Sequence, residues 1–202
     1  MQQNLFDSSA EKLLPFDGEV EYYPSFFSME DSNNFLSTLK EKINWVQEPI
    51  KIFGKEVMQP RLTALYGDPK IPYGYSGIEM RAYPWSIDLK EIKERVEDAA
   101  DQEFTHVLLN YYRTGEDSMG WHRDNEPVLG LNPVIASVSF GEERAFQFRH
   151  YHKKELKREI KLQHGSLLIM KGETQHHWEH QLPKRKRISG GRINLTFRKI
   201  LT

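Results

Sequence analysis

The sequence predicts a mainly β protein of the α+β class, in which two helices support an antiparallel β-structure. Two observations predict this class. Two stretches with apolar residues at helical spacing lie in the first hundred residues, and short runs rich in β-branched and aromatic residues follow. The 202 residues, 38% of them hydrophobic, suffice for one hydrophobic core. We therefore expect a single domain over residues 1–202, built as a sandwich, barrel or jelly roll, with the polar residues 1–15 disordered.

The two predicted helices cover residues 31–43 and 86–100. Asp31 or Ser32 is a candidate N-cap for the first helix, and Ser86 is the candidate for the second. The apolar residues at helical spacing are Phe35, Leu36, Leu39 and Ile43 in the first helix and Leu89, Ile92, Val96 and Ala100 in the second. Each helix thus has one apolar face, which we expect to pack on the β-structure.

Five β-rich runs follow residue 104, separated by glycine, proline and charged turns. They are HVLLNYY, PVIASVSFG, AFQFRH, GSLLIM and RINLTFRKI. The last run alternates strictly, so Ile193, Leu195 and Phe197 share one face, and the other face carries polar side chains that include Arg192 and Arg198. Two guanidinium groups are costly to bury without an anion. This strand therefore either lies at an edge in water or holds a small dicarboxylate inside the fold.

The composition excludes several classes of protein. The chain has no cysteine, so disulfides, zinc fingers and iron–sulfur clusters are excluded. It has no apolar run near 18 residues and no basic-then-apolar leader, so we expect an intracellular protein without a membrane partner. A monomer in a bacterial cytoplasm is the default expectation, whereas Lys184–Arg187 resembles a nuclear import signal in a eukaryote.

The net charge of −1 hides an asymmetry between the two halves of the chain. Residues 1–100 contain 11 basic and 17 acidic residues, and residues 101–202 contain 17 and 12. Positive charge concentrates in Arg149–Arg158 and Pro183–Arg187. These segments fit a surface that binds a polyanion, although solvated loops have the same composition.

The segment MGWHRDNEP, residues 119–127, contains a candidate metal site. His122 and Asp124 alternate, so in extended chain both side chains point to one face. Two histidines and one carboxylate form the facial triad of non-haem Fe(II) oxygenases. His176, His177 and His180 are the candidates for the third ligand. A helix-borne zinc site, with His176 and His180 as ligands and Glu179 as base, is a weaker alternative.

Several of these segments closely resemble the AlkB family of Fe(II)- and 2-oxoglutarate-dependent dioxygenases, in particular its branch that acts on duplex DNA. They are NYYRTGEDSMGWHRDNE, IASVSFG, HGSLLIM, HHWEHQLPKRKR and RINLTFRKI. The resemblance extends from about residue 50 to the C-terminus. It implies a double-stranded β-helix, that is, a jelly roll, with helices supporting one side. It also implies a nucleotide-recognition region over residues 50–85 and a catalytic core over residues 104–202.

By this resemblance, the iron ligands would be His122, Asp124 and His180. The keto acid end of 2-oxoglutarate would chelate the iron, and Arg198 would hold its far carboxylate. Asn110, Tyr112, Arg192 and Asn194 would complete that pocket. His176 and His177 would be neighbours of the site, and we expect a packing or ligand-supporting role for His177.

The resemblance also implies substrate-binding residues. Glu126 would meet the polar edge of a cationic methylated base, such as N1-methyladenine or N3-methylcytosine. Tyr73 and Tyr75 would stack on the extruded base, and Phe53 would fill the gap that the base leaves. Arg61 would line the face that contacts DNA. Exposed aromatic residues in a turn, and packing of Phe53 on the helices, are the alternatives for these aromatic side chains.

The implied reaction is the oxidative demethylation of N-alkylated DNA bases with Fe(II), 2-oxoglutarate and O₂. It releases formaldehyde, succinate and CO₂ and constitutes direct-reversal repair. The expected partner is duplex DNA with a flipped alkylated base, with single-stranded DNA or RNA as other candidates. An AlkB-like oxygenase acting on RNA or protein, and a nucleic-acid-binding jelly roll without enzymatic activity, remain alternatives.

Overall fold

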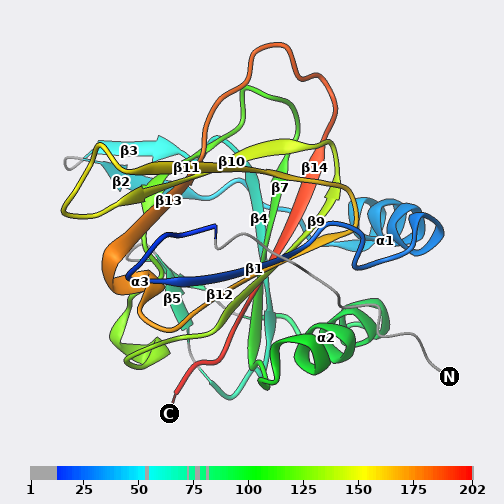
Figure 1. Ribbon diagram of the computed structural model, residues 1–202. Helices are drawn as coiled ribbons and strands as arrows, with labels where there is room; N and C mark the ends of the chain where they lie inside the picture. The colour runs from blue at the N-terminus through cyan, green and yellow to red at the C-terminus, as the bar shows by residue number, and fades with distance from the viewer. Residues whose placement is uncertain (1–12, 53–54, 72, 76–77, 81, 202) are drawn as a thin grey trace, which may run out of the picture.

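The computed structural model describes residues 13–52, 55–71, 73–75, 78–80 and 82–201 (Figure 1). Its larger sheet has six strands in the order β1-β12-β9-β14-β7-β4. They are β1 (Glu19–Tyr23), β12 (Ser166–Lys171), β9 (Ile135–Gly141), β14 (Arg192–Arg198), β7 (His106–Tyr112) and β4 (Leu62–Gly67). All of their pairings are antiparallel.

The smaller sheet has four strands in the order β11-β10-β13-β8. They are β11 (Lys157–Leu162), β10 (Arg144–His150), β13 (Trp178–Leu182) and β8 (Met119–His122). Two separate hairpins pair β2 (Pro49–Ile52) with β3 (Lys55–Met58) and β5 (Tyr73–Tyr75) with β6 (Ile78–Met80). A 3₁₀ turn, η1 (Pro127–Leu129), and a one-turn helix, α3 (Thr174–His177), complete the connections around the smaller sheet.

Two apolar clusters divide the molecule into layers. The first joins one face of the larger sheet to α1 (Met29–Lys42) and α2 (Ile87–Ala100), which lie together on one side of the molecule in Figure 1. The second cluster joins the opposite face of that sheet to the smaller sheet, through side chains such as Leu168 and Phe148. The larger sheet is therefore covered on both faces, and its inner face meets the smaller sheet as two stacked layers.

The strand β14 shows how one alternating pattern serves both layers. Ile193, Leu195 and Phe197 belong to the cluster beneath the helices, so the polar side chains between them point toward the smaller sheet. The strand pairs with β9 on one side and with β7 on the other, which places it in the middle of the sheet. The prediction of an apolar packing face is confirmed, and the alternative of an edge strand is wrong.

Both predicted helices are present, with a shifted start for the first. The hydroxyl of Ser28 accepts the N–H of Asp31 at 3.0 Å, so α1 begins at Met29 rather than at residue 31. Ser86 caps α2 as predicted by accepting the N–H of Leu89. Asp101 ends α2 in the left-handed conformation, with φ of 48°.

The strand β1, which precedes α1, is not predicted from the sequence. Residues 19–23 form β1, which pairs in register with β12, because Glu19 lies opposite Lys171 and Tyr23 opposite Leu167. Of residues 1–15, which were expected to be disordered, the last three are described, and Leu14 is buried in the cluster between the sheets. Among the described residues, no helix has the length and apolar character that crossing a membrane requires.

Candidate metal and cofactor site

The strands β8 and β13 bring two of the predicted iron ligands together. His122 ends β8 and lies opposite His180 in the register of β13, with the ring centroids 4.3 Å apart. Asp124 lies two residues beyond the end of β8. Ligand-type atoms of these three side chains all lie within 4.8 Å of one another. The geometry thus supports His180 as the third member, whereas His176 and His177 lie on α3 and have other contacts.

The two histidines are in the protonation state that a metal requires. The Nδ1 of His122 lies 2.9 Å from the carbonyl oxygen of Gly120, so Nδ1 carries the proton and Nε2 has a free lone pair. Burial, together with the neighbouring His122, lowers the pKa of His180 to about 3. Burial also lowers the pKa of His122. Both imidazoles are therefore neutral and able to bind a cation.

The carboxylate of Asp124 is charged and only partly satisfied. Its side chain is 1% exposed, and Oδ2 accepts a hydrogen bond from the Nη2 of Arg198 at 2.8 Å. Burial alone would raise the pKa of Asp124, but Arg198, His122 and His180 outweigh burial and hold it below its ordinary value. Among the described residues, the buried atoms Oδ1 of Asp124 and Nδ1 of His180 have no hydrogen-bond partner. A divalent cation fits this donor set, since it would satisfy a buried carboxylate oxygen.

A second charged side chain, that of Arg192, is at the first residue of β14. Arg198, which is bonded to Asp124, is at the last residue of the same strand. Arg192 is 2% exposed, donates from Nη2 to the hydroxyl of Ser139 at 2.8 Å, and lies over the ring of Tyr112 at 5.4 Å. Burial lowers the pKa of Arg192 to about 10, which leaves the guanidinium charged at neutral pH. Its Nε has no hydrogen-bond partner, and no carboxylate in the described part of the chain pairs with it. A buried, unpaired guanidinium fits an anionic ligand.

These positions change the expected orientation of 2-oxoglutarate. Arg198 was expected to hold the far carboxylate, but it is already bonded to Asp124 at the metal end of the pocket. Arg192 lies six residues before Arg198 in the same strand, about 20 Å away measured along the backbone. The expectation for Arg198 does not fit this geometry, and Arg192 is the better candidate for the far carboxylate.

One pocket joins the two charged ends. Its lining includes all of the residues predicted for the metal and the cosubstrate, which are Asn110, Tyr112, His122, Asp124, His180, Arg192, Asn194 and Arg198. Strands of both sheets contribute to it, and Leu108, Phe146 and Met170 are among the apolar residues of its wall. A small dicarboxylate with a chelating end matches such a pocket, because charged groups mark both ends and apolar groups lie between them.

Arg61 occupies a position that differs from the expected one on the DNA face. It is 3% exposed, and its Nε donates to the Oδ1 of Asn110 at 2.7 Å. Asn110 lines the pocket, so Arg61 supports the pocket wall from behind. This contact orients the Asn110 side chain, with its amide oxygen directed at Arg61.

The structure describes the other expected substrate residues only in part. Glu126 is half-buried, and burial, with the charge of Asp124, raises the pKa of its carboxyl group. For Tyr73 and Tyr75 the structure gives the backbone, which pairs with β6, and their side chains are not described. Phe53 lies outside the described residues. The substrate roles of these four residues therefore remain predictions.

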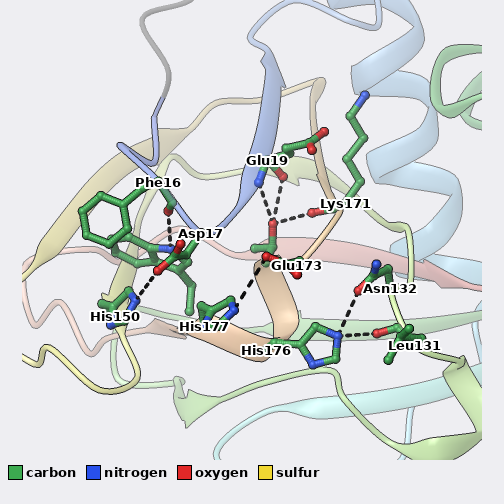
Figure 2. A network of polar contacts seen from close by, with 12 residues as sticks. Phe16, Asp17, Glu19, Leu131, Asn132, His150, Lys171, Glu173, His176 and His177 are labelled. Carbon is green, nitrogen blue, oxygen red and sulfur yellow. Dashed lines mark hydrogen bonds and ion pairs between the residues drawn. The ribbon is translucent and has the colours of Figure 1, made fainter.

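A second group of ligand-type side chains is a hydrogen-bonded cluster. Asp17, His150 and His177 also bring such atoms within 4.8 Å of one another (Figure 2). However, the Nδ1 of His150 accepts the backbone N–H groups of His152 and Lys153, at 3.3 and 3.0 Å. The proton of a neutral His150 is therefore on Nε2, which donates to Asp17 at 3.3 Å. That nitrogen is not available to a cation, in contrast with the Nε2 of His122.

The basic segment Arg149–Arg158 forms the end of β10, a turn and the start of β11. Part of its charge is neutralised by Glu179, which is buried and pairs with Arg149 and with Lys154. Arg149 also lies over the ring of Trp121 at 4.2 Å. Lys157 and Arg158 at the start of β11 are exposed. Lys157 and Arg158 therefore place positive charge on the β11 side of the turn.

Comparisons with known proteins agree with this fold and site. The family model described as the 2OG-Fe(II) oxygenase superfamily matches residues 19–198. The chain belongs to this superfamily and is an Fe(II)- and 2-oxoglutarate-dependent dioxygenase that uses O₂. A solved structure described as that of OsALKBH1 covers 89% of this chain and 97% of its own length, with a TM-score of 0.64 and 18% identity. This likeness concerns the fold alone, and it confirms the predicted jelly roll.

Two curated relatives place the chain in the AlkB family. The bovine protein named DNA oxidative demethylase ALKBH2 is 39% identical over 189 residues, which are 89% of this chain and 68% of the relative. The human protein named alpha-ketoglutarate-dependent dioxygenase alkB homolog 3 is 39% identical over 187 residues, which are 88% of this chain and 65% of the relative. The chain thus spans about two thirds of the length of these relatives.

Proposed function

We propose that this protein removes methyl groups oxidatively from the ring nitrogens of DNA bases, as a direct-reversal repair enzyme. One observation carries the proposal: a single pocket contains the His122–Asp124–His180 group at one end and Arg192, which no carboxylate of the described residues neutralises, at the other. The names of the relatives support DNA as the substrate, because one is called a DNA oxidative demethylase.

Different residues of the pocket would bind the metal and the cosubstrate. His122, Asp124 and His180 would hold Fe(II), and Arg192 with Tyr112 would hold the far carboxylate of 2-oxoglutarate. When bound, the metal with 2-oxoglutarate and O₂ supplies an oxidant that hydroxylates the N-methyl group, while 2-oxoglutarate becomes succinate and CO₂. The cationic N-hydroxymethyl product then breaks its N–C bond: the electron pair returns to the ring nitrogen, the hydroxyl proton goes to solvent, and formaldehyde leaves.

The chain itself contributes orientation and the exclusion of water. Arg198 would fix the carboxylate of Asp124, so that the ligand keeps one orientation during turnover. Leu108, Phe146 and Met170 would keep the space around the metal apolar, which limits side reactions of the oxidant with solvent. Glu126 would meet a cationic methylated base, since a half-buried carboxylate near Asp124 favours a positively charged neighbour.

We further propose that duplex DNA is the preferred substrate. The β2–β3 hairpin forms its own sheet, and Val57 and Met58 in β3 are 46% and 51% exposed. Exposed apolar side chains on a separate hairpin favour contact with a duplex that is opened at the site of an extruded base. The exposed cations at the start of β11 would contact the phosphate backbone.

A comparison of substrates tests this proposal. Oligonucleotides of one sequence, each with a single N1-methyladenine, would be supplied as duplex DNA, single-stranded DNA and RNA, and initial rates of demethylation would be measured. The proposal predicts the highest kcat/KM for the duplex. A higher value for RNA or for the single strand would overturn the duplex assignment and leave the oxygenase assignment intact.

A further inference from the structure

The short helix α3 is fixed in place by contacts with four separate parts of the chain. The hydroxyl of Thr174 accepts the N–H of Glu19 at 2.9 Å and lies 2.5 Å from the carbonyl oxygen of Lys171. His176 contacts the carbonyl oxygen of Leu131 and the side chain of Asn132. Figure 2 shows these contacts converging on the helix from β1, from β12 and from the loop after η1. The adjacent Trp178 adds a fourth, since its Nε1 donates to the carbonyl oxygen of Phe16 at 3.0 Å.

The same helix holds the segment that carries the metal carboxylate. Gln175 on α3 is 0% exposed, and its Oε1 accepts the backbone N–H of Asp124 at 2.9 Å. The next residue of the helix, His176, accepts a hydrogen bond at its carbonyl oxygen from Arg123 at 2.9 Å. Two successive residues of the metal segment are thus bonded to two successive residues of α3.

The metal segment needs such a support because it lies outside the sheet. The pairing of β8 with β13 ends at His122, and Asp124 follows two residues later, before η1. Burying an N–H group without a partner is destabilising, so the backbone N–H of Asp124 requires an acceptor at this point. Since the N–H group can only donate, the amide of Gln175 is oriented with its oxygen toward Asp124 and its nitrogen toward the Sδ of Met170, at 3.6 Å.

We infer that Gln175 is a positioning residue for the metal site: its side-chain oxygen fixes the backbone of Asp124 and thereby the direction of the metal-binding carboxylate. Arg198 fixes the same residue through its side chain, so the two contacts together determine where Oδ1 points. The inference rests on the proposed metal site. Gln175 cannot be found from the sequence alone, because glutamine at this spacing carries no distinguishing signal.

The test measures metal affinity in three variants of the full chain. Gln175→Met removes the acceptor oxygen at nearly constant size, and Gln175→Glu keeps an oxygen at the same reach. Thr174→Val is the matched control, because it removes an equally buried polar contact of α3 that does not touch Asp124. Mn(II), a redox-inert stand-in for Fe(II), would be titrated into metal-free protein, and the free ion would be followed by its electron paramagnetic resonance signal.

We expect Gln175→Met to weaken Mn(II) binding by about tenfold or more, as is typical of residues that support metal ligands. Gln175→Glu and Thr174→Val should stay within about threefold of wild type, well below that range. Melting temperatures of the metal-free variants report folding, and hydrogen exchange at the Asp124 amide should accelerate in Gln175→Met alone.

The other outcomes distinguish Gln175 itself, the helix α3 as a whole and the metal site. Weakening by Thr174→Val equal to that by Gln175→Met would assign the effect to α3 as a whole and reject the role of Gln175. Unchanged binding in Gln175→Met, or equal loss in Gln175→Glu, would also reject it. If Gln175→Met does not fold, the Glu variant decides the matter, since retained affinity supports the role of the oxygen. Absence of Mn(II) binding by the wild type would instead refute the metal site itself.

Discussion

Arg192 and Arg198 are the same type of side chain on one face of one strand, and their surroundings give them different roles. Arg198 is bonded to Asp124, so its charge is already compensated within the protein. Arg192 has a hydroxyl and an aromatic ring as partners but no carboxylate among the described residues. Only Arg192 therefore has a net positive charge to offer to a ligand. A similar contrast of environment separates His122, which has a free Nε2, from His150, which does not.

Replacement of Arg192 by lysine should raise the KM for 2-oxoglutarate by about 10- to 100-fold and change kcat less. The reason is that lysine keeps the charge but loses the planar fork, and a charged hydrogen bond contributes about 1.5 to 3 kcal/mol. Steady-state kinetics with 2-oxoglutarate as the varied substrate measure this effect. Arg198→Lys is the contrasting variant, since it should weaken Mn(II) binding through Asp124. A KM that is unchanged in Arg192→Lys would place the far carboxylate elsewhere.

Sequence patterns predicted local geometry well and long-range partners poorly. The alternation in residues 192–198 predicted both faces of β14, because the period of two is a property of the strand itself. The contact of Arg198 with Asp124 joins residues 74 positions apart, and that of Arg61 with Asn110 joins residues 49 apart. No local pattern encodes such distances, so the orientation of 2-oxoglutarate and the burial of Arg61 were not foreseen.

At the level of elements, the connection from β7 to β8 is held by two charged side chains. Asp117 accepts hydrogen bonds from the backbone N–H and the guanidinium of Arg113, at 2.7 to 2.9 Å. The buried Arg144 donates to the carbonyl oxygens of Thr114, Asp117 and Pro183. This network fixes the chain immediately before β8, which carries His122. The helix α3 holds the chain immediately after β8, through Arg123 and Asp124.

Replacement of Asp117 by asparagine should lower the free energy of unfolding by about 1 to 3 kcal/mol at neutral pH, because charged hydrogen bonds are lost. Burial would raise the pKa of Asp117, but the hydrogen bonds of Arg113 outweigh it and lower the pKa below its ordinary value of 3.8. The stabilisation is therefore complete above that value and is lost as the pH falls through the lower, folded-state pKa.

Urea unfolding of wild type and Asp117→Asn at several pH values measures this effect. The difference between the two proteins should be constant near neutrality and should shrink in acid. Asp98→Asn, on the exposed face of α2, is the matched control and should leave stability within about 0.5 kcal/mol. A difference that grew toward low pH would contradict the assigned direction.

The whole molecule separates its charges along the chain. The acidic first half contains both long helices together with β1 and β4 of the larger sheet, and the basic second half contains the other strands of both stacked sheets and the pocket. Exposed cations at the start of β11 and in Lys184–Arg187 lie in this second half. Such a distribution favours the approach of a polyanion to the pocket side and gives an affinity that depends strongly on salt.

Replacement of both Lys157 and Arg158 by glutamine should weaken DNA binding equally for different sequences. Each lost phosphate contact should also reduce the slope of log Kd against log salt by about 0.9. Fluorescence anisotropy at several salt concentrations measures both quantities. Lys40→Gln, an exposed position on α1, is the control and should leave the slope unchanged. A sequence-dependent loss of affinity would instead indicate direct contacts with base edges.

The proposed reaction of this pocket is the oxidative demethylation of DNA. Mass spectrometry of a duplex oligonucleotide with one N1-methyladenine, incubated with protein, Fe(II), ascorbate and 2-oxoglutarate, tests it most directly. We expect loss of one methylene mass with the wild type, and no loss without 2-oxoglutarate or with Asp124→Ala. An unchanged oligonucleotide with continued consumption of 2-oxoglutarate would contradict the assigned substrate. Demethylation that persists in Asp124→Ala would contradict the metal site.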